Sequence, residues 1–333
     1  MMTKTKMRNF YERMLVPHTG KALQKAPLVQ TAWLIEEMIP SAGVTFLHGP
    51  TTAGKSALAW AIGNAVQTGK PLFGLPAIKA RVLFVSLDMA EAPLKMRWFG
   101  TKDKPKSSKA KFYPEFDTVF PSTFPFIDDS DDGEAFREVF KKSIEPYGLI
   151  IIDALGRFVG DTISGPDATR CYQHLNQILR EKACILIHHD GKNKGKSTDK
   201  GKASSDDYSG TKRWIDFAQH QLHLTQSNTE AMRILHQGKS QLAPDRDESW
   251  KLMIDSDGKM CLYDEAKIVR DRLEKAKEKV KRSTPGFDKL KRRAQDEAIG
   301  KELGISGRSV RTLIEKARKP EPKPKLELVR RAI

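Results

Sequence analysis

The sequence has few cysteines and no long hydrophobic run. These two features exclude several classes of protein. Its three cysteines, Cys171, Cys184 and Cys261, are widely spaced and form neither a CxxC pair nor an even set for a disulfide framework. We therefore expect no structural metal and a reducing compartment, the cytoplasm. No apolar run approaches the roughly 18 residues of a membrane span, and no apolar stretch follows the basic start of the chain. Neither membrane insertion nor a signal peptide is expected.

Positive charge is in excess and unevenly distributed. The 333 residues carry a formal net charge of +16, and 39% of them are hydrophobic, as in soluble globular proteins. From Ala266 to Ile333 there are 22 lysine and arginine residues against 10 aspartate and glutamate residues, a local charge of +12. This excess indicates a polyanionic partner, most simply a nucleic acid. A solvated basic tail is the alternative that composition leaves open.

The segment Gly49-Pro50-Thr51-Thr52-Ala53-Gly54-Lys55-Ser56 fits the phosphate-loop pattern G-x-x-x-x-G-K-[ST]. An apolar strand pattern, Val44–His48, precedes it, and a helical pattern begins at Ala57, which is the context that the motif requires. Backbone N–H groups of such a loop surround the phosphates, while its lysine reaches the β- and γ-phosphates and its serine binds Mg²⁺. The sequence therefore predicts an ATP site formed by Gly49, Pro50, Thr51, Thr52, Ala53, Gly54, Lys55, Ser56 and Ala57.

Three further strand patterns end in polar side chains. Arg81–Met89 contains Asp88, Leu149–Asp153 ends in Asp153, and Cys184–His189 ends in His188 and His189. Helical patterns alternate with these strands, which predicts a doubly wound parallel sheet. Because ligands of such sheets bind at the carboxyl ends of the strands, we expect these polar groups beside the phosphate loop. Four later patterns, near residues 221–224, 232–236, 250–254 and 260–263, predict antiparallel strands that complete the sheet.

These residues together resemble one known family. Glu37-Met38-Ile39-Pro40 with Gly43, the phosphate loop, Ser86–Met89, Leu149–Leu155 and His188-His189 resemble the RecA-like ATPases of the RepA type, which are related to the hexameric replicative DNA helicases of plasmids and phages. The resemblance covers roughly two thirds of the chain, and the paired histidines are its more specific part. It implies a RecA-like P-loop core with a mostly parallel sheet flanked by helices, ATP and Mg²⁺ as cofactors, and a homo-oligomeric ring, commonly a hexamer.

The resemblance also implies roles for single residues. Lys55 and Ser56 would hold the phosphates and Mg²⁺, and Asp153 would hold Mg²⁺ through water, unless it is an ordinary helix cap. Asp88 stands where the family usually has the glutamate that orients the attacking water. Aspartate is one carbon shorter, so Glu91 is the alternative. His189, or else His188, would sense the γ-phosphate, although a histidine at a strand end can be purely structural.

Two sets of basic residues are implied as well. A neighbouring subunit would supply a basic finger to the ATP site, for which Lys239 and then Arg213 are the candidates, with surface charge as the alternative. The segments 156–165 and 190–208 resemble loops that carry single-stranded DNA through the ring. Their candidate phosphate contacts are Lys192, Lys194, Lys196, Lys200 and Lys202. A Lys/Gly/Ser-rich surface excursion is the alternative for the second loop.

The basic end of the chain has helix-turn-helix spacing from 295 to 318, with Gly304 in the turn and Ser306 as N-cap of the second helix. That helix would place Arg308 and Arg311 near a duplex groove, although short helix pairs match the spacing by accident. RepA-type proteins need not carry such a segment. The expected domains are a basic arm (1–26), the ATPase domain (27–265), a charged linker (266–286) and a small all-α helix-turn-helix-like segment with its tail (287–333).

Three functions share the ATP residues. The first is a ring helicase that translocates on single-stranded DNA in plasmid or phage replication. The second is an ATP-dependent DNA-binding regulator or loader of replication. The third is a recombination or repair ATPase, against which stands the lack of a helix-plus-strand module typical of filament assembly.

Overall fold

A computed structural model of the chain divides into two units, 1–31 and 32–333, of which the first contains a single described residue, Gly20. The residues that the structure describes are 20, 32–99, 115–122, 124–125, 129–154, 165–179, 181–189, 218–227, 232–238, 240, 249–255 and 258–317. No helix in these ranges has the length and apolar character that a membrane crossing requires.

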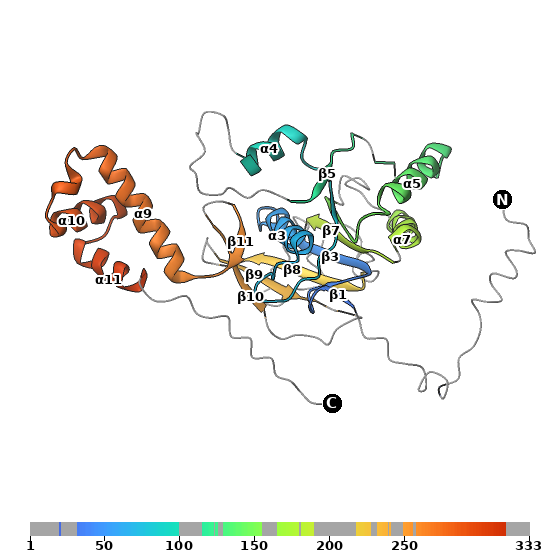
Figure 1. Cartoon of the computed structure of the whole chain (residues 1–333), viewed down its shortest axis with the longest axis horizontal. Coiled ribbons are helices and arrows are strands. Elements are labelled where there is room, and N and C mark those ends of the chain that lie inside the picture. Colours follow the sequence, from blue (N-terminus) through green and yellow to red (C-terminus); the bar gives the residue numbers. More distant parts are fainter. Residues whose placement is uncertain are drawn as a thin grey trace, which may run out of the picture. The chain divides into compact units, whose positions relative to one another are not determined.

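The described residues of the second unit form a nine-stranded sheet in the order β11-β10-β9-β8-β3-β7-β6-β4-β5 (Figure 1). Its strands are β3 (Gly43–Gly49), β4 (Val82–Ser86), β5 (Asp117–Val119), β6 (Leu149–Asp153), β7 (Ala183–His189), β8 (His220–Gln226), β9 (Met232–Gln237), β10 (Ser249–Ile254) and β11 (Met260–Leu262). Neighbouring strands in the stretch β8-β3-β7-β6-β4-β5 pair in parallel. Neighbouring strands in the stretch β11-β10-β9-β8 pair antiparallel. This confirms the expected mostly parallel sheet flanked by helices, with one correction: β8, expected as antiparallel, is parallel to β3 and antiparallel only to β9.

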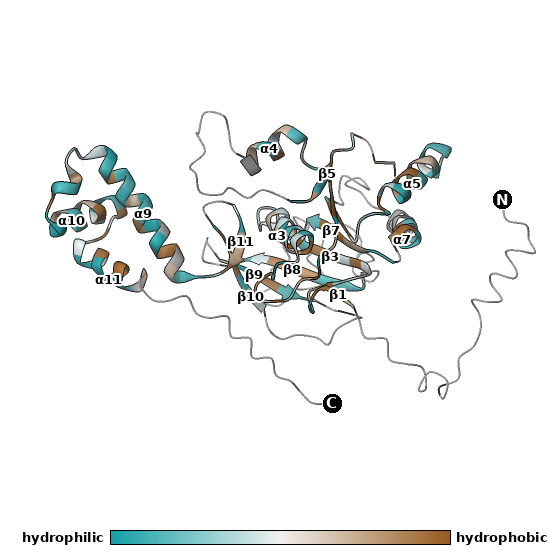
Figure 2. Ribbon diagram, viewed as in Figure 1, coloured by the Kyte–Doolittle hydropathy of each residue, from teal (hydrophilic) through white to brown (hydrophobic). Residues whose placement is uncertain are grey.

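Apolar side chains cover both faces of the parallel strands, as their near-continuous hydrophobic runs require. On one face, α3 (Lys55–Thr68) packs Leu58 and Ile62 against Ile151 of β6 and its neighbours. On the other face, α5 (Asp131–Ser143) and α7 (Gly165–Leu179) pack against a second cluster that contains Phe46. Brown segments run along the central strands in Figure 2, although the end of β7 is teal. Successive residues of a strand point to opposite faces, so each polar residue at a strand end belongs to one of these two faces.

Local signals set the ends of these helices. Gly69 ends α3 in the left-handed conformation (φ 72°), which a residue without Cβ adopts freely. Acidic residues surround the start of α5. Ser130 accepts a hydrogen bond from the Gly133 N–H (3.3 Å), and the acidic residues of the first turn lie at the positive end of the helix dipole. The two short strands β1 (Trp33–Ile35) and β2 (Ile39–Pro40) form a separate hairpin, and α4 (Glu91–Phe99) follows β4.

The last described segment has its own hydrophobic core. It comprises α9 (Glu265–Ser283), the 3-10 turn η1 (Phe287–Lys289), α10 (Arg292–Leu303) and α11 (Gly307–Ala317). Its buried residues are Ala276, Val280, Phe287, Ile299 and Val310, while hydrophilic residues cover much of the helices (Figure 2). The 266–286 segment, expected as a charged linker, is thus mostly helix, and the later turns of α9 share a core with α10 and α11. We call α9–α11 the helical unit.

Candidate functional site

The phosphate loop is a strained turn between β3 and α3. Thr52 (φ 75°) and Gly54 (φ 97°) both lie in the left-handed region. Lys55 is only 4% exposed, and its Nζ donates hydrogen bonds to the backbone carbonyls of Gly49 and Pro50, both at 2.8 Å. The buried ammonium therefore lies inside the loop, where a bound phosphate would compete with these carbonyls for it.

Residues of β8, β10 and β11 lie close to this loop. A Cβ on Gly49 would lie 2.1 Å from the Leu224 carbonyl oxygen of β8. A Cβ on Gly54 would lie 2.9 Å from Ile254 Cδ1 of β10 and 3.1 Å from Met260 Cε of β11. Both glycines of the motif are therefore required by packing as well as by the approach of a phosphate.

Arg233 on β9 is a site residue that the sequence did not reveal. Its Nε donates a hydrogen bond (3.0 Å) to the backbone carbonyl of Ala53, 180 residues away in the phosphate loop. The side chain is partly buried, and desolvation lowers the pKa of the guanidinium. An arginine in a short alternating strand carries no local signal of such a contact, since only the sheet order brings β9 to the loop.

The structure brings two of the predicted acids together. Asp153 ends β6 on the α3 face and is 9% exposed. Its backbone carbonyl accepts hydrogen bonds from the N–H groups of Leu87 (2.7 Å) and Asp88 (3.1 Å), so the turn after β4 is fixed to the end of β6. Asp88 itself is exposed. Glu91, the alternative to Asp88, is also exposed and forms an ion pair with Lys95 within α4.

The two adjacent histidines at the end of β7 belong to different faces of the sheet. His189 pairs with Gly49 of β3 in the parallel register and continues the α3 face. His188 is buried on the other face, with its ring 5.6 Å from Phe46. On that face His48 also stacks on His223 of β8, at a ring distance of 4.3 Å. The structure thus places His189, and not His188, on the face of the phosphate loop.

Oxygen ligands suited to Mg²⁺ are present at this edge. Ser56 occupies the first turn of α3, which packs against β6, the strand that ends in Asp153. A hydroxyl and a carboxylate are the hard oxygen donors that Mg²⁺ prefers beside phosphate oxygens. These two residues would hold the ion, whose chemistry is to neutralise charge on the phosphates. No group of three or more His, Cys, Asp or Glu side chains in the described ranges has metal-binding geometry.

Several predicted residues lie outside the described part of the chain. They are Lys239, Arg213, Lys192, Lys194, Lys196, Lys200 and Lys202. Of the two arginines predicted near a duplex, Arg308 is exposed on α11, whereas Arg311 donates from Nε to Asp296 Oδ2 (2.9 Å) on α10. Ser306 accepts a hydrogen bond from the Ser309 N–H (3.1 Å), as expected of an N-cap.

A strand, a phosphate loop with a buried lysine, and carboxylates at neighbouring strand ends define a P-loop nucleoside triphosphatase. The AAA domain family matches residues 12–195, more than half of the chain, and the chain belongs to this family of ATPases. Among solved structures, it is similar to a KaiC-like protein of the hyperthermophilic archaeon Pyrococcus horikoshii (16% identity, 71% of this chain and 98% of that chain, TM-score 0.45). It is also similar to the RadB recombinase (15% identity, 68% and 93%, TM-score 0.43). No match was found among curated proteins.

Proposed function

We propose that the protein is a ring-forming ATPase of the RepA type that translocates on single-stranded DNA and opens duplex DNA during replication. The observation that carries this proposal is the register of β3 and β7. His189, the last residue of β7, lies directly opposite Gly49, the first glycine of the phosphate loop. The Lys-rich segment 190–208 follows His189 directly in the sequence, so a change at the phosphates has a short path along the chain to the residues proposed to hold DNA.

Within this proposal the site residues divide the work of hydrolysis. Lys55 and the loop N–H groups hold the phosphates, and Ser56 and Asp153 hold Mg²⁺. Asp88 orients the attacking water, since its turn is fixed to the end of β6. Glu91, which pairs with Lys95 within α4, is the alternative. A water-positioning group and neutralisation of the phosphate charge are the two things that phosphoryl transfer requires.

The proposal extends to the subunit interface and the pore. Lys239, with Arg213 as second candidate, supplies the basic finger to the ATP site of a neighbouring subunit, commonly one of six in a ring. Lys192, Lys194, Lys196, Lys200 and Lys202 follow the phosphates of the single strand without reading its sequence.

A forked DNA substrate tests the proposal. ATP-dependent strand displacement is expected from the full chain, together with ATP hydrolysis that single-stranded DNA stimulates. Lys55→Ala should reduce hydrolysis by about two orders of magnitude, because it removes a cation from the developing charge, and should abolish displacement. His189→Gln should retain basal hydrolysis better than Lys55→Ala but lose stimulation by DNA. Hydrolysis without displacement would contradict the motor.

A regulator or loader is the second candidate, and the helical unit favours it. That unit has its own core and a helix-turn-helix-like pair, α10 and α11, so duplex binding through Arg308 and Arg311 is its proposed activity. Removal of the residues after Glu265 separates the two functions. A motor should still separate strands after this truncation, whereas a regulator should lose its tight binding to duplex DNA.

A further inference from the structure

The charges of the helical unit are not evenly paired. Four ion pairs engage acidic residues of η1 and α10: Lys281 with Asp288, Arg311 with Asp296, Arg293 with Glu297, and Lys279 with Glu302. Arg292, in the first turn of α10, is exposed, and its side chain forms no ion pair or hydrogen bond with any residue that the structure describes. It is therefore a cation without a compensating acid, in a turn that contains no acidic residue.

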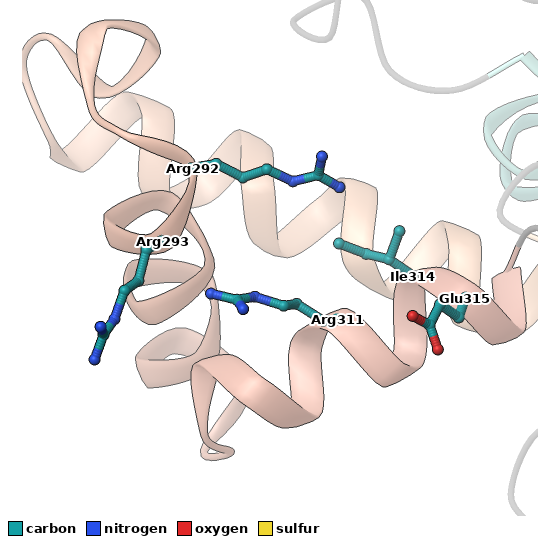
Figure 3. A pocket seen from close by; sticks show the side chains of 5 residues that line it. All are labelled: Arg292, Arg293, Arg311, Ile314 and Glu315. Atoms are coloured by element: carbon teal, nitrogen blue, oxygen red, sulfur yellow. The ribbon is translucent and has the colours of Figure 1, made fainter.

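A groove of about 390 Å³ lies between α10 and α11 and is lined by Arg292, Arg293, Arg311, Ile314 and Glu315. Figure 3 shows Arg292 and Arg311 reaching over the same opening from their two helices, while the head group of Arg293 points outward. Three of the five lining residues are arginines, and Glu315 is the one acid among them. The groove therefore suits a ligand that carries negative charge.

One of these arginines is held in place before any ligand arrives. Arg311 Nε lies 2.9 Å from Oδ2 of Asp296, a carboxylate whose side chain is 5% exposed, while the Arg311 side chain is 53% exposed. The buried carboxylate fixes the guanidinium, and part of that guanidinium still faces the groove. An arginine fixed in this way loses little conformational entropy when it binds an anion.

The two helices that line the groove pack closely near the turn that joins them. A Cβ on Gly300 would lie 2.6 Å from the Ile305 carbonyl oxygen, and a Cβ on Gly307 would lie 3.0 Å from Glu297 Cγ. The turn between the helices, 304–306, contains a left-handed glycine, Gly304 (φ 67°). Two helices joined by a short glycine-containing turn are the arrangement with which helix-turn-helix units dock on duplex DNA.

We propose that this groove binds a backbone phosphate of duplex DNA, with Arg292 as its main contact, Arg311 as a fixed second cation and Arg293 at the rim. The proposal deepens, and rests on, the proposed duplex binding by the helical unit. It shifts the contact from the outer side of α11, where Arg308 lies, to the start of α10. Contacts of this kind position a protein on DNA and carry no sequence information.

Binding of the full chain to a labelled duplex, measured by fluorescence anisotropy without nucleotide over a series of salt concentrations, tests the proposal. Arg292→Ala should weaken binding roughly fivefold and reduce the slope of log affinity against log salt by about 0.9, the value for one phosphate contact. The matched control is Lys301→Ala, which removes one exposed charge at the other end of α10, outside the groove lining, and should leave the slope closer to that of the original chain. An unchanged melting temperature for both variants shows that neither effect comes from unfolding.

Each other outcome overturns the proposal in a recognisable way. No duplex binding by the original chain would refute the proposed function of the helical unit and the groove with it. Duplex binding that Arg292→Ala leaves unchanged, or that Lys301→Ala weakens equally, would refute the groove alone. The groove would instead be assigned to a free anion if inorganic phosphate bound to the original chain but not to Arg292→Ala, at an ionic strength matched with chloride, while the affinity for DNA was the same in both. If Arg292→Ala weakened the binding of single-stranded DNA alone, the proposed binding of duplex DNA by the groove would be refuted.

Discussion

Replacing Arg233 by methionine tests whether the far half of the sheet sets the conformation of the phosphate loop. The substitution retains a long apolar side chain in β9 but removes the hydrogen bond from Nε to the Ala53 carbonyl. Hydrogen bonds that involve a charged group contribute about 1.5–3 kcal/mol. We take about 1.5 kcal/mol of this as the stabilisation of the turn at Thr52 and Gly54 in its binding-competent conformation. In Arg233→Met this stabilisation is lost, so part of the binding free energy of the nucleotide must order the loop instead. The dissociation constant for ATP should then rise about tenfold, since 1.4 kcal/mol corresponds to one factor of ten.

Titration with a fluorescent ATP analogue measures this effect directly, and denaturant unfolding measures the stability of the same samples. Arg233→Lys keeps the charge but lacks the planar Nε–H, so it should recover only part of the affinity. Lys251→Met, which removes an exposed cation from neighbouring β10, serves as the control for loss of charge. Unchanged affinity of Arg233→Met for the nucleotide, in a protein of unchanged stability, would refute the reasoning. So would equal losses in Arg233→Met and Lys251→Met.

Two further predictions concern the glycines and the buried histidines. Gly54→Ala should abolish ATP binding, because its Cβ would meet Ile254 at 2.9 Å in a left-handed turn, whereas Gly258→Ala, equally left-handed but in open space, should lower stability only. Burial lowers the pKa of His220 to about 4, so the unfolded chain takes up a proton near pH 6.5 that the folded chain refuses until near pH 4. The free energy of unfolding, measured with urea, should therefore be about 2 kcal/mol lower at pH 5 than at neutral pH. In His220→Asn the free energy of unfolding should depend less on pH. An unchanged slope in His220→Asn would assign the acid sensitivity to other groups.

Sequence patterns predicted the parts of the fold that depend on neighbouring residues. The phosphate loop and the N-cap at Ser306 are each specified within about a dozen residues by known local chemistry. The carboxylate at the end of β6 followed equally well, because a buried parallel strand is recognisable as a continuous apolar run.

The same patterns did not predict how strands that are far apart in the sequence pair with one another. Whether β8 pairs in parallel with β3 or antiparallel is not encoded in the alternation of its residues, which is the same in both cases. The contact of Arg233 with Ala53 depends on that pairing and on β9 lying next to β8. The sequence did not show that 266–286 shares a core with the segment after it, for a related reason: the apolar positions of α9 acquire a partner only when α10 and α11 fold against them.

Strands β8 to β11 therefore do more than extend the sheet. β8 contributes the Leu224 carbonyl, β9 contributes Arg233, and β10 and β11 contribute the side chains that contact Gly54. The loop that holds phosphate is thus held on one side by its own strand and helix and on the other by residues 170 or more positions later in the chain. Because packed interfaces of this kind change between discrete arrangements rather than deforming continuously, a perturbation of β9–β11 should be felt as a change in nucleotide affinity, even though none of these strands carries a residue of the phosphate-loop motif.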